Sequence, residues 1–259
     1  MKKLVKILAA TAVLAVSLTG CKKATDGKFV LGLDASFPPM GFTAANGEII
    51  GYDIDLAKEV AKRLNKEFVA KPINWEAKEM ELSSGSIDCI WNGFTITPER
   101  EEAMSLTKPY LNNDQVLVVR KEGDIKSLKD AKGKVIGVQA SSSAEDAIKA
   151  NQEFNSSVKK VVLYEENLTA LTDLEVGGVD AVVMDSVVAN YTILTSGKPL
   201  EIIGESLAKE AYGIGFRKDE KGQALRDQVQ ATLEQMASDG TVEKISLKWF
   251  GSNISVIGK

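Results

Sequence analysis

One arginine follows a run of apolar residues in a way that suggests a role in binding an anion. The run Ile87–Trp91 leads into the segment Asn92-Gly-Phe-Thr-Ile-Thr-Pro-Glu-Arg100. Thr97 and Pro98 are typical of a helix N-cap and of the first helical position. Arg100 would then lie in the first helical turn, where the helix dipole disfavours a cation. A guanidinium can bind a carboxylate through two parallel hydrogen bonds. Arg100 therefore either receives a carboxylate or is solvated or paired locally.

Two further segments place polar groups where strands are expected to end. Ala140-Ser-Ser-Ser143 precedes a helical pattern, so its hydroxyls and free N–H groups could bind an anion or simply cap the helix. Asp185 follows an apolar run and could accept an ammonium group or cap the next helix. Phe37, Trp75 and Trp91 could line a cleft or belong to the core. Together these groups offer a carboxylate site, an ammonium site and flat walls, which suit a free amino acid.

The composition excludes several kinds of chemistry. The chain contains no histidine, which removes the commonest metal ligand and the commonest general base. Neither a glycine-rich phosphate loop nor a serine nucleophile elbow occurs. Cys89 lies in an apolar run, as an inert core thiol does. We therefore expect binding without catalysis, and neither a cofactor nor a metal.

Strand and helix patterns alternate along the chain. Extended apolar runs predict strands at 29–33, 68–70, 87–91, 135–138, 160–163 and 181–184. Apolar spacing predicts helices capped by Asp53 and near 77–82, 144–150, 168–176, 187–194 and 221–237. Such alternation predicts an α/β fold with parallel or mixed sheets covered by helices. Ligands of such sheets bind beyond the carboxyl ends of the strands. The segments at Arg100, Ser143 and Asp185 all follow strands.

Two extended runs, 115–120 and 212–216, bracket the middle third of the chain. If both cross between lobes, residues 28–115 and 214–259 form lobe 1, and residues 116–213 form an inserted lobe 2. Two α/β lobes joined by a pair of strands can close over a ligand like a hinge. The prediction is a two-lobed α/β fold with the ligand cleft between the lobes.

The N-terminus has the pattern of an export signal. Lys2, Lys3 and Lys6 precede the apolar run 7–18, which is shorter than the roughly 20 residues of a spanning helix. Removing residues 1–20 would take away three lysines and change the formal net charge from −4 to −7. An acidic mature domain argues against nucleic acid as a partner.

The segment Leu18-Thr-Gly-Cys21 resembles the lipobox of bacterial lipoproteins. The resemblance implies a lipid on Cys21, residues 21–27 as a tether, and an extracytoplasmic protein anchored to the cell membrane. Two acyl chains would anchor it stably. Cys89 would then be the one cysteine left, so no internal disulfide could form.

Six motifs in order resemble the polar amino-acid-binding proteins of ABC importers, which have the type II periplasmic-binding-protein-like fold. They are Asp34–Met40, Gly51–Ala57, Gly93–Arg100, Val138-Gln139, Val179–Asp185 and Tyr212–Arg217. The match covers about Lys28 to Phe250. It implies a monomer that binds a free amino acid and delivers it to the membrane subunits of an ABC permease.

The resemblance also implies roles for individual residues. Arg100 and Thr95 would bind the ligand carboxylate, with help from Ser142 and Ser143. Asp185 and the backbone of Gly93 would bind the α-ammonium group. The ligand side chain would lie among Asp34, Phe37, Trp75 and Asn92, and Gln139 completes the expected site.

The chain departs from the family pattern at two places. Ser141 stands where the family usually has glycine. Lys78-Glu79-Met80 stands where the family usually has Leu-Ile-Pro, which predicts either a more solvated helix or Glu79 at the rim of the pocket.

Asp34 could offset a cationic ligand side chain, so arginine or lysine is the first expectation, with glutamine, histidine and cystine behind. An alternative is a cyclohexadienyl-dehydratase-like enzyme on the same scaffold, with Glu79 as the one unusual candidate for its general acid. A sensing domain is a third interpretation, although neither a transmembrane helix nor a kinase follows Lys259.

Overall fold

The computed structural model describes residues 27–259. The predicted signal peptide at 1–20, Cys21 and the tether up to residue 26 lie outside the described residues. Within the described part of the chain, no helix combines the length and the apolar character needed to cross a bilayer.

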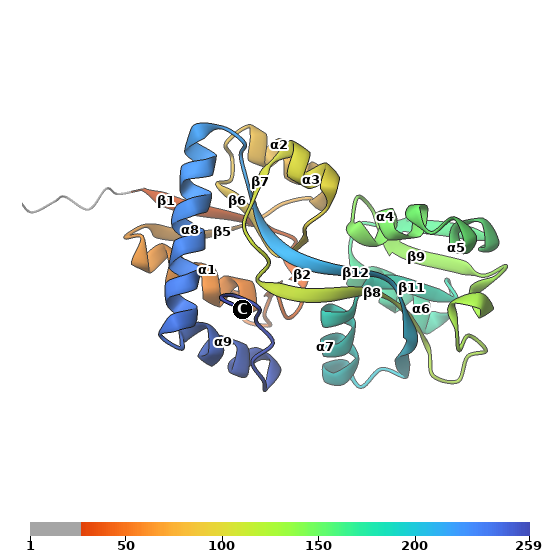
Figure 1. The fold of residues 1–259 in the computed structure, drawn as a ribbon. Coiled ribbons are helices and arrows are strands. Elements are labelled where there is room, and N and C mark those ends of the chain that lie inside the picture. The colour runs from red at the N-terminus through yellow and green to blue at the C-terminus, as the bar shows by residue number, and fades with distance from the viewer. Residues whose placement is uncertain (1–26) are drawn as a thin grey trace, which may run out of the picture.

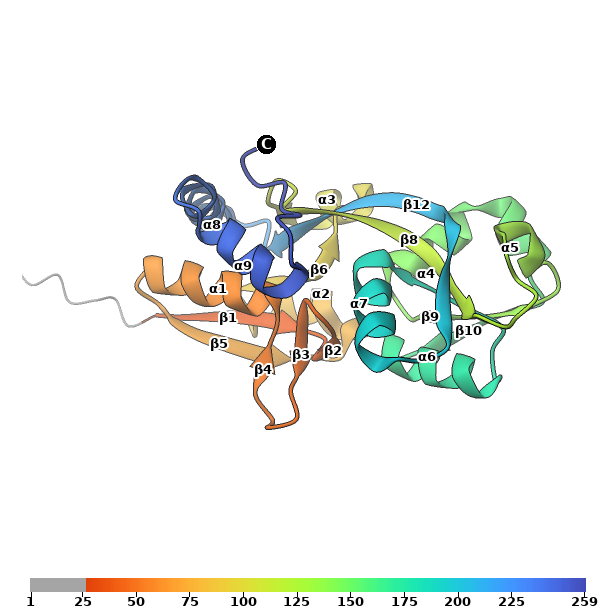
Figure 2. The same cartoon turned by 90° about the horizontal axis from the view of Figure 1, so that it is seen from below.

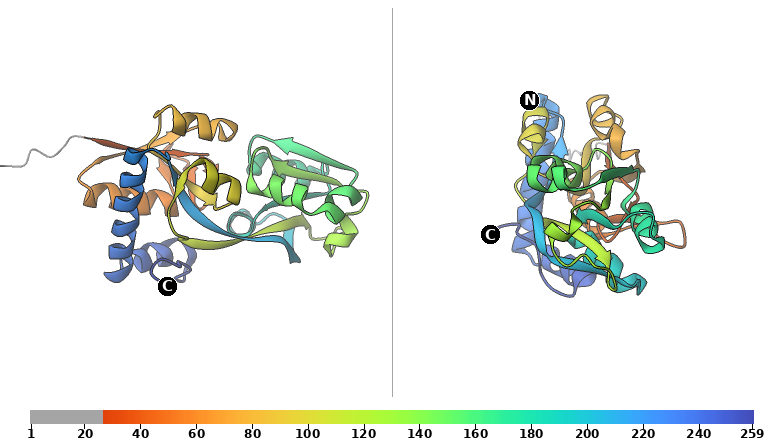
Figure 3. Two further views of the ribbon diagram at one scale, coloured as in Figure 1. Left: turned by 45° about the horizontal axis from the view of Figure 1, so that its top comes forward. Right: turned by 90° about the vertical axis from the view of Figure 1, so that its right-hand side faces the viewer.

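Two α/β lobes lie side by side and are joined by two long strands, β8 (Leu111–Arg120) and β12 (Leu200–Phe216) (Figure 1). These strands belong to one nine-stranded sheet with the order β10-β9-β11-β8-β12-β6-β1-β5, and β7 also pairs with β12. Between the lobes, residues 111–115 of β8 pair antiparallel with residues 208–212 of β12. The same two strands pass from one lobe into the other in Figure 3. The predicted two-lobed α/β fold is confirmed.

Lobe 1 contains both ends of the described chain. Its sheet contains the parallel strands β1 (Lys28–Leu33), β5 (Glu67–Pro72) and β6 (Cys89–Thr95). The end of β12 pairs antiparallel with β6 and with the short β7 (Ser105–Leu106). A three-stranded sheet, β2 (Ser36–Phe37), β3 (Gly41–Thr43) and β4 (Ile49–Ile50), lies beside it. The helices are α1 (Tyr52–Arg63), the 3-10 helix η1 (Trp75–Ala77), α2 (Lys78–Ser83), α3 (Pro98–Ala103), α8 (Glu220–Ser238) and α9 (Thr241–Phe250).

Lobe 2 is built on β9 (Val135–Gln139), β10 (Lys160–Tyr164) and β11 (Ala181–Asp185), with β8 and the start of β12. Its helices are η2 (Leu128–Ala131), α4 (Ser143–Ala150), α5 (Gln152–Ser157), α6 (Asn167–Val176) and α7 (Ser186–Ser196). Figure 2 shows α7 of lobe 2 and α9 of lobe 1 on the same side of the molecule. The carboxyl ends of β9 and β11 point toward lobe 1 (Figure 1). The helices α4 and α7 begin directly after these strand ends.

Most of the predicted elements are present, and the differences have physical reasons. The predicted strand at 212–216 is the end of a strand that begins at Leu200, because the polar stretch before it continues the pairing with β8. The small sheet β2–β4, the helix α5 and the helix α9 were not predicted. Their short or mixed apolar patterns give little periodic signal. The lobe boundaries at 115/116 and 213/214 stay a prediction.

The expectation that Asp53 caps a helix is wrong. The helix α1 begins at Tyr52 after Gly51, and no side chain caps it. Gly51 has φ 149°, and a Cβ there would lie 2.1 Å from the Met40 carbonyl oxygen. The Asp53 carboxylate instead faces inward, where it accepts hydrogen bonds from the Gly93 N–H at 2.8 Å and the Tyr110 hydroxyl at 3.0 Å. Burial raises the pKa of Asp53 to about 7.

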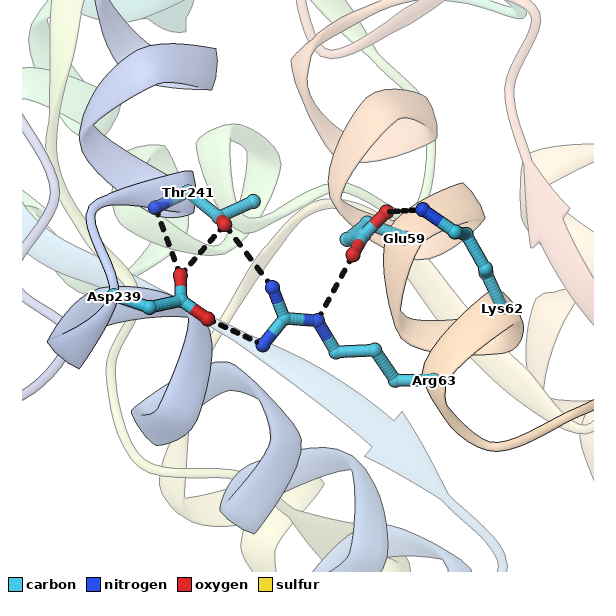
Figure 4. Close-up of polar contacts among 5 residues, drawn as sticks. All are labelled: Glu59, Lys62, Arg63, Asp239 and Thr241. Atoms are coloured by element: carbon cyan, nitrogen blue, oxygen red, sulfur yellow. Dashed lines mark hydrogen bonds and ion pairs between the residues drawn. The ribbon is translucent and has the colours of Figure 1, made fainter.

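An ion-pair network ties the end of α1 to the junction of α8 and α9 (Figure 4). The Arg63 Nε donates to Glu59 at 2.9 Å, and its Nη1 donates to Asp239 at 2.7 Å. Its Nη2 donates to the Thr241 hydroxyl at 3.0 Å. Arg63 therefore has carboxylate partners within its own lobe.

Replacing Asp53 with alanine should destabilise lobe 1. The variant leaves two buried donors unpaired, the Gly93 N–H and the Tyr110 hydroxyl. Each unsatisfied buried group costs about 1–3 kcal/mol, so we expect the free energy of unfolding to fall by roughly 2–5 kcal/mol. Urea denaturation measures the change. Lys58→Ala, at an exposed position of the same helix, is the control and should stay within about 0.5 kcal/mol. A loss below about 1 kcal/mol for Asp53→Ala would contradict the structural role.

Candidate functional site

A small cavity lies between the lobes, at the carboxyl ends of β1, β6, β9 and β11. Its empty volume is about 280 Å³, including its opening to solvent. Its lining contains all but one of the residues that the sequence predicted for ligand binding: Asp34, Phe37, Trp75, Asn92, Gly93, Arg100, Gln139, Ser142, Ser143 and Asp185. Thr95 is the predicted residue that does not line the cavity.

Arg100 is a buried arginine without a carboxylate partner. Its position follows from the predicted cap, because the Thr97 hydroxyl accepts a hydrogen bond from the Arg100 N–H at 3.3 Å and Pro98 begins α3. The residue is 7% exposed. Its Nη1 donates to the Thr95 carbonyl at 2.7 Å, and its guanidinium carbon lies 4.1 Å from the centre of the Phe94 ring. Within residues 27–259, no carboxylate lies within ion-pair distance of it.

The environment of Arg100 therefore differs from that of Arg63. Burial lowers the pKa of Arg100, since desolvation disfavours the charged form. Charged side chains are almost never buried unless they are paired. A guanidinium that lines a cavity without a counter-ion is a ready site for an anion.

The end of β6 forms one wall of the cavity. Gly93 has φ 55°, and a Cβ there would lie 2.8 Å from Phe37 Cε1 and 3.2 Å from the Tyr212 ring. A side chain at this position would therefore collide with Phe37 and Tyr212. The neighbouring Asn92 accepts the Asp34 N–H at 3.0 Å through Oδ1. Its Nδ2 is buried without a partner among the described residues.

Asp185 provides a buried carboxylate on the opposite lobe. It precedes α7, but its side chain makes no capping bond, so the capping alternative is wrong. The carboxylate accepts hydrogen bonds from Asn113 Nδ2 at 2.7 Å and from the Tyr212 hydroxyl at 2.8 Å. Burial, followed by the nearby charge of Glu210, raises the pKa of Asp185 to about 7. A cation bound beside it would favour the ionised form.

The serines at the start of α4 have different roles. Ser142 caps the helix, since its hydroxyl accepts the Glu145 N–H at 3.2 Å and donates to the Gln139 carbonyl at 2.7 Å. Ser143 faces lobe 1, and its hydroxyl donates to the Thr95 hydroxyl at 3.0 Å. The capping alternative therefore holds for Ser142, although Ser142 also lines the cavity.

Hydrogen bonds across the cavity join the two lobes. Gln139 Nε2 donates to Asp34 Oδ2 at 2.8 Å. The other oxygen of Asp34 accepts the Ser36 N–H at 2.9 Å and the Ser36 hydroxyl at 2.6 Å. Together with the bond between Ser143 and Thr95, these contacts give a closed arrangement of the lobes.

The aromatic residues divide between wall and core. Phe37 and Trp75 line the cavity, whereas Trp91 is fully buried against Tyr110 in the core of lobe 1. Cys89 is also buried, and burial raises the pKa of its thiol, as expected for an inert core cysteine. Glu79 is exposed and does not line the cavity, so its predicted place at the pocket is wrong.

Two charged residues near the cavity were missed by the sequence analysis. Glu210 Oε2 accepts hydrogen bonds from the Thr95 hydroxyl and from Gln115 Nε2, both at 2.9 Å. The alternation of a strand would have placed Glu210 on the same side as Tyr212. Lys78, rather than Glu79, is the buried residue at the departure from the family pattern. Its spacing of three residues from Trp75 puts both on one helical face.

The sequence signature of the bacterial extracellular solute-binding proteins, family 3, matches residues 29–252. The chain belongs to this family. Its members are extracytoplasmic solute-binding proteins and not enzymes, so the prediction of binding without catalysis is confirmed. The resemblance to amino-acid-binding proteins of ABC importers is also confirmed by named relatives.

Three of these relatives bind different amino acids. The chain described here is 33% identical to the ABC transporter arginine-binding protein 1 of Escherichia coli K12, over 96% of this chain and 99% of that protein. It is 30% identical to the L-cystine-binding protein TcyJ of the same strain, over 88% and 85%. The fold is also similar to the crystal structure of an ABC uptake transporter substrate-binding protein from Streptococcus pneumoniae with bound histidine. The two chains share 35% sequence identity and a TM-score of 0.85, and the match covers 88% of this chain and 94% of that chain.

In the closed arrangement of the lobes, the pKa of the Asp185 carboxyl should be about 7, well above the ordinary aspartate value of about 3.9. Tyr212→Phe should raise this pKa further, because the hydroxyl donates to the charged form. Carboxyl ¹³C NMR of aspartate-labelled protein measures both, with Asp185→Asn for assignment. Tyr164→Phe, whose hydroxyl contacts Asp173 instead, should leave it unchanged. A midpoint below pH 5 would contradict this assignment.

Proposed function

We propose that this family member is an extracytoplasmic lipoprotein that binds a basic amino acid, arginine or lysine, and delivers it to an ABC importer. The observation that carries the proposal is the buried guanidinium of Arg100, which has no carboxylate partner among residues 27–259 and lines a cavity with two carboxylates. A free amino acid supplies the missing carboxylate and at least one cation.

The ligand carboxylate binds Arg100, and the α-ammonium group binds Asp185 and the Gly93 carbonyl in this proposal. The ligand side chain then extends toward Asp34, between Phe37 and Trp75. One guanidinium and two carboxylates line the cavity, so an ionised site carries one net negative charge. This balance favours a ligand with two cationic groups. An aromatic wall can also pack on a guanidinium plane or on an aliphatic stem.

Asp34 is not a free carboxylate in the closed arrangement. Ser36 and Gln139 already donate to its two oxygens. All of these donors are neutral, so they leave the charge of Asp34 uncompensated, and each carboxylate oxygen can accept more than one hydrogen bond. Glutamine, histidine and cystine remain the alternative ligands, and relatives of this chain bind histidine and cystine.

The rest of the proposal concerns anchoring and delivery. Residues 1–20 are removed as a signal peptide, a lipid on Cys21 anchors the protein to the membrane, and residues 21–27 form the tether. Residues 28–115 with 214–259 move as one lobe and residues 116–213 as the other. The monomer delivers its ligand to the membrane subunits of the permease.

Titration calorimetry of the protein from residue 22 onward tests the proposed function. The protein is titrated with L-arginine, L-lysine, L-glutamine, L-histidine and L-cystine, and mass spectrometry then examines each ligand. We expect arginine or lysine to bind most tightly and to remain unaltered. No binding of any of the five amino acids would overturn the proposal. Tighter binding of glutamine, histidine or cystine would overturn the preference for a basic ligand.

Replacing Arg100 with methionine should greatly weaken binding. The variant keeps an unbranched side chain but removes the guanidinium that lies over Phe94, and it leaves the ligand carboxylate without its partner in a closed site. Removing one partner of a buried charge pair costs about 2–5 kcal/mol, so the Kd should rise by roughly 30-fold or more. Arg63→Met is the control, because it removes a guanidinium from the same lobe away from the cavity. A Kd for Arg100→Met within threefold of the wild type would exclude the assigned role.

Replacing Asp34 with asparagine should discriminate between ligands. The substitution keeps the size and one acceptor oxygen but removes the charge. Hydrogen bonds to charged groups contribute about 1.5–3 kcal/mol, compared with 0.5–1.5 for neutral ones. Arginine and lysine should therefore bind roughly tenfold more weakly or worse, and glutamine should lose much less. Any weakening of the bond between Gln139 and Asp34 affects every ligand equally and cancels in the ratio. Equal losses for arginine and glutamine would show that Asp34 acts on closure alone.

A further inference from the structure

Lys78 is a buried lysine that reaches from lobe 1 to lobe 2 and lies outside the lining of the cavity. It is the first residue of α2 and is 4% exposed. Its Nζ donates to the Ser141 carbonyl at 2.8 Å and to the Trp75 carbonyl at 3.2 Å, and lies 5.2 Å from the centre of the Trp75 ring. The Trp75 carbonyl belongs to the same lobe, so only the bond to Ser141 depends on the position of lobe 2.

The acceptor is held in place within lobe 2. Ser141 lies between β9 and α4 with φ 55°, and its N–H donates to Glu145 Oε2 at 2.7 Å. This bond fixes the turn and with it the direction of the carbonyl.

Apart from the bonds made by the crossing strands β8 and β12, the other hydrogen bonds between the lobes are of different kinds. Those between Gln139 and Asp34 and between Ser143 and Thr95 involve groups expected to bind the ligand. Asn74 donates to Glu165 at 3.0 Å on the exposed rim, where water competes for both groups. The bond from Lys78 is part-buried, and it combines a charged donor with independence from the ligand contacts.

We propose that Lys78 is a clasp, a positioning residue whose bond to the Ser141 carbonyl forms when the lobes close and slows the release of the bound amino acid. The inference rests on the proposed amino-acid binding. In an open arrangement the Ser141 carbonyl moves away with lobe 2, and the ammonium group returns to water.

The charges around Lys78 connect the clasp with the ligand. Arg100 of α3 is a nearby cation, whereas Glu76, Glu79 and Asp146 are nearby anions. Burial, followed by the charge of Arg100, lowers the pKa of Lys78 to about 8, so the group is still mostly an ammonium at neutral pH. In the described part of the chain, neither Lys78 nor Arg100 has a carboxylate within ion-pair distance. A ligand carboxylate at Arg100 supplies negative charge beside both, so the clasp is most favourable when the cleft is occupied.

A clasp that forms after the ligand has entered should affect dissociation rather than association. Encounter takes place with the open protein, in which the bond is absent. The closed complex must break the bond before the ligand leaves. A purely structural defect in lobe 1 would instead lower stability and disturb association as well.

Stopped-flow fluorescence of the tryptophans, with L-arginine as the probe, tests the clasp in the protein from residue 22 onward. If calorimetry shows another of the five amino acids to bind more tightly, that amino acid is the probe. Lys78→Met keeps the aliphatic stem and removes the ammonium group. We expect its dissociation rate to rise about tenfold, equivalent to ~1.4 kcal/mol, with association within twofold of the wild type. Lys71→Met is the matched control, because Lys71 pairs with Glu81 inside lobe 1, and should release the probe at the wild-type rate.

The outcomes distinguish the clasp from the proposed function. Binding by the wild type with unchanged release from Lys78→Met would overturn the clasp and leave amino-acid binding intact. A wild type that binds none of the five amino acids would overturn both. Thermal melting checks the fold of the variant. Lys78→Gln, with a neutral and shorter donor, is a second variant expected to release the probe faster, and wild-type release from it would also overturn the clasp.

Discussion

The unpaired guanidinium of Arg100 is the constraint to which the rest of the site responds. A buried charge without a counter-ion is expensive, and the protein reduces this cost only partly. The Thr95 carbonyl accepts one hydrogen bond and the Phe94 ring lies against the cation. Both contacts belong to lobe 1, so they hold the guanidinium in place before lobe 2 arrives. Completing its coordination requires a group from outside the described chain, and closing the lobes makes that requirement stronger because water is excluded.

The carboxylates are arranged so that they do not satisfy Arg100 themselves. Asp53 is bound by the Gly93 N–H and by Tyr110 beneath the cavity, while Asp185 is held by Asn113 and Tyr212. These hydrogen bonds hold each carboxylate in a position away from Arg100. This separation of opposite charges leaves Arg100 without a carboxylate partner from the described residues. Glu210 extends the same principle to the crossing strands, where it accepts hydrogen bonds from Thr95 of lobe 1 and Gln115 of β8.

Much of this site could be predicted because each residue follows a local signal. Thr97-Pro98 predicts a helix start, the runs before Asn92 and Asp185 predict buried strands, and the carboxyl ends of strands meet at one edge. What could not be predicted depends on contacts between distant segments. Asp53 has the residue type of a cap, yet its partners are Gly93 and Tyr110, which local spacing does not reveal. The helix of Lys78 and Glu79 was predicted, and the spacing from Trp75 favours Lys78 as the buried residue, but the contact of Lys78 with Ser141 of lobe 2 has no local signal.

The two lobes therefore contribute different interactions to the equilibrium between the open and closed arrangements. Lobe 1 holds a cation that lacks a partner, and lobe 2 brings a carboxylate, hydroxyls and the Ser141 carbonyl toward it. Without a ligand, closure desolvates Arg100 and Lys78 and supplies neither with a carboxylate. With the proposed ligand, the same closure completes the coordination of Arg100 and brings negative charge near Lys78. A ligand can shift a conformational equilibrium only by its difference in affinity for the two states. For the proposed amino-acid ligand, that difference arises from two cations, Arg100 and Lys78, which closure buries near each other and whose repulsion the ligand carboxylate reduces.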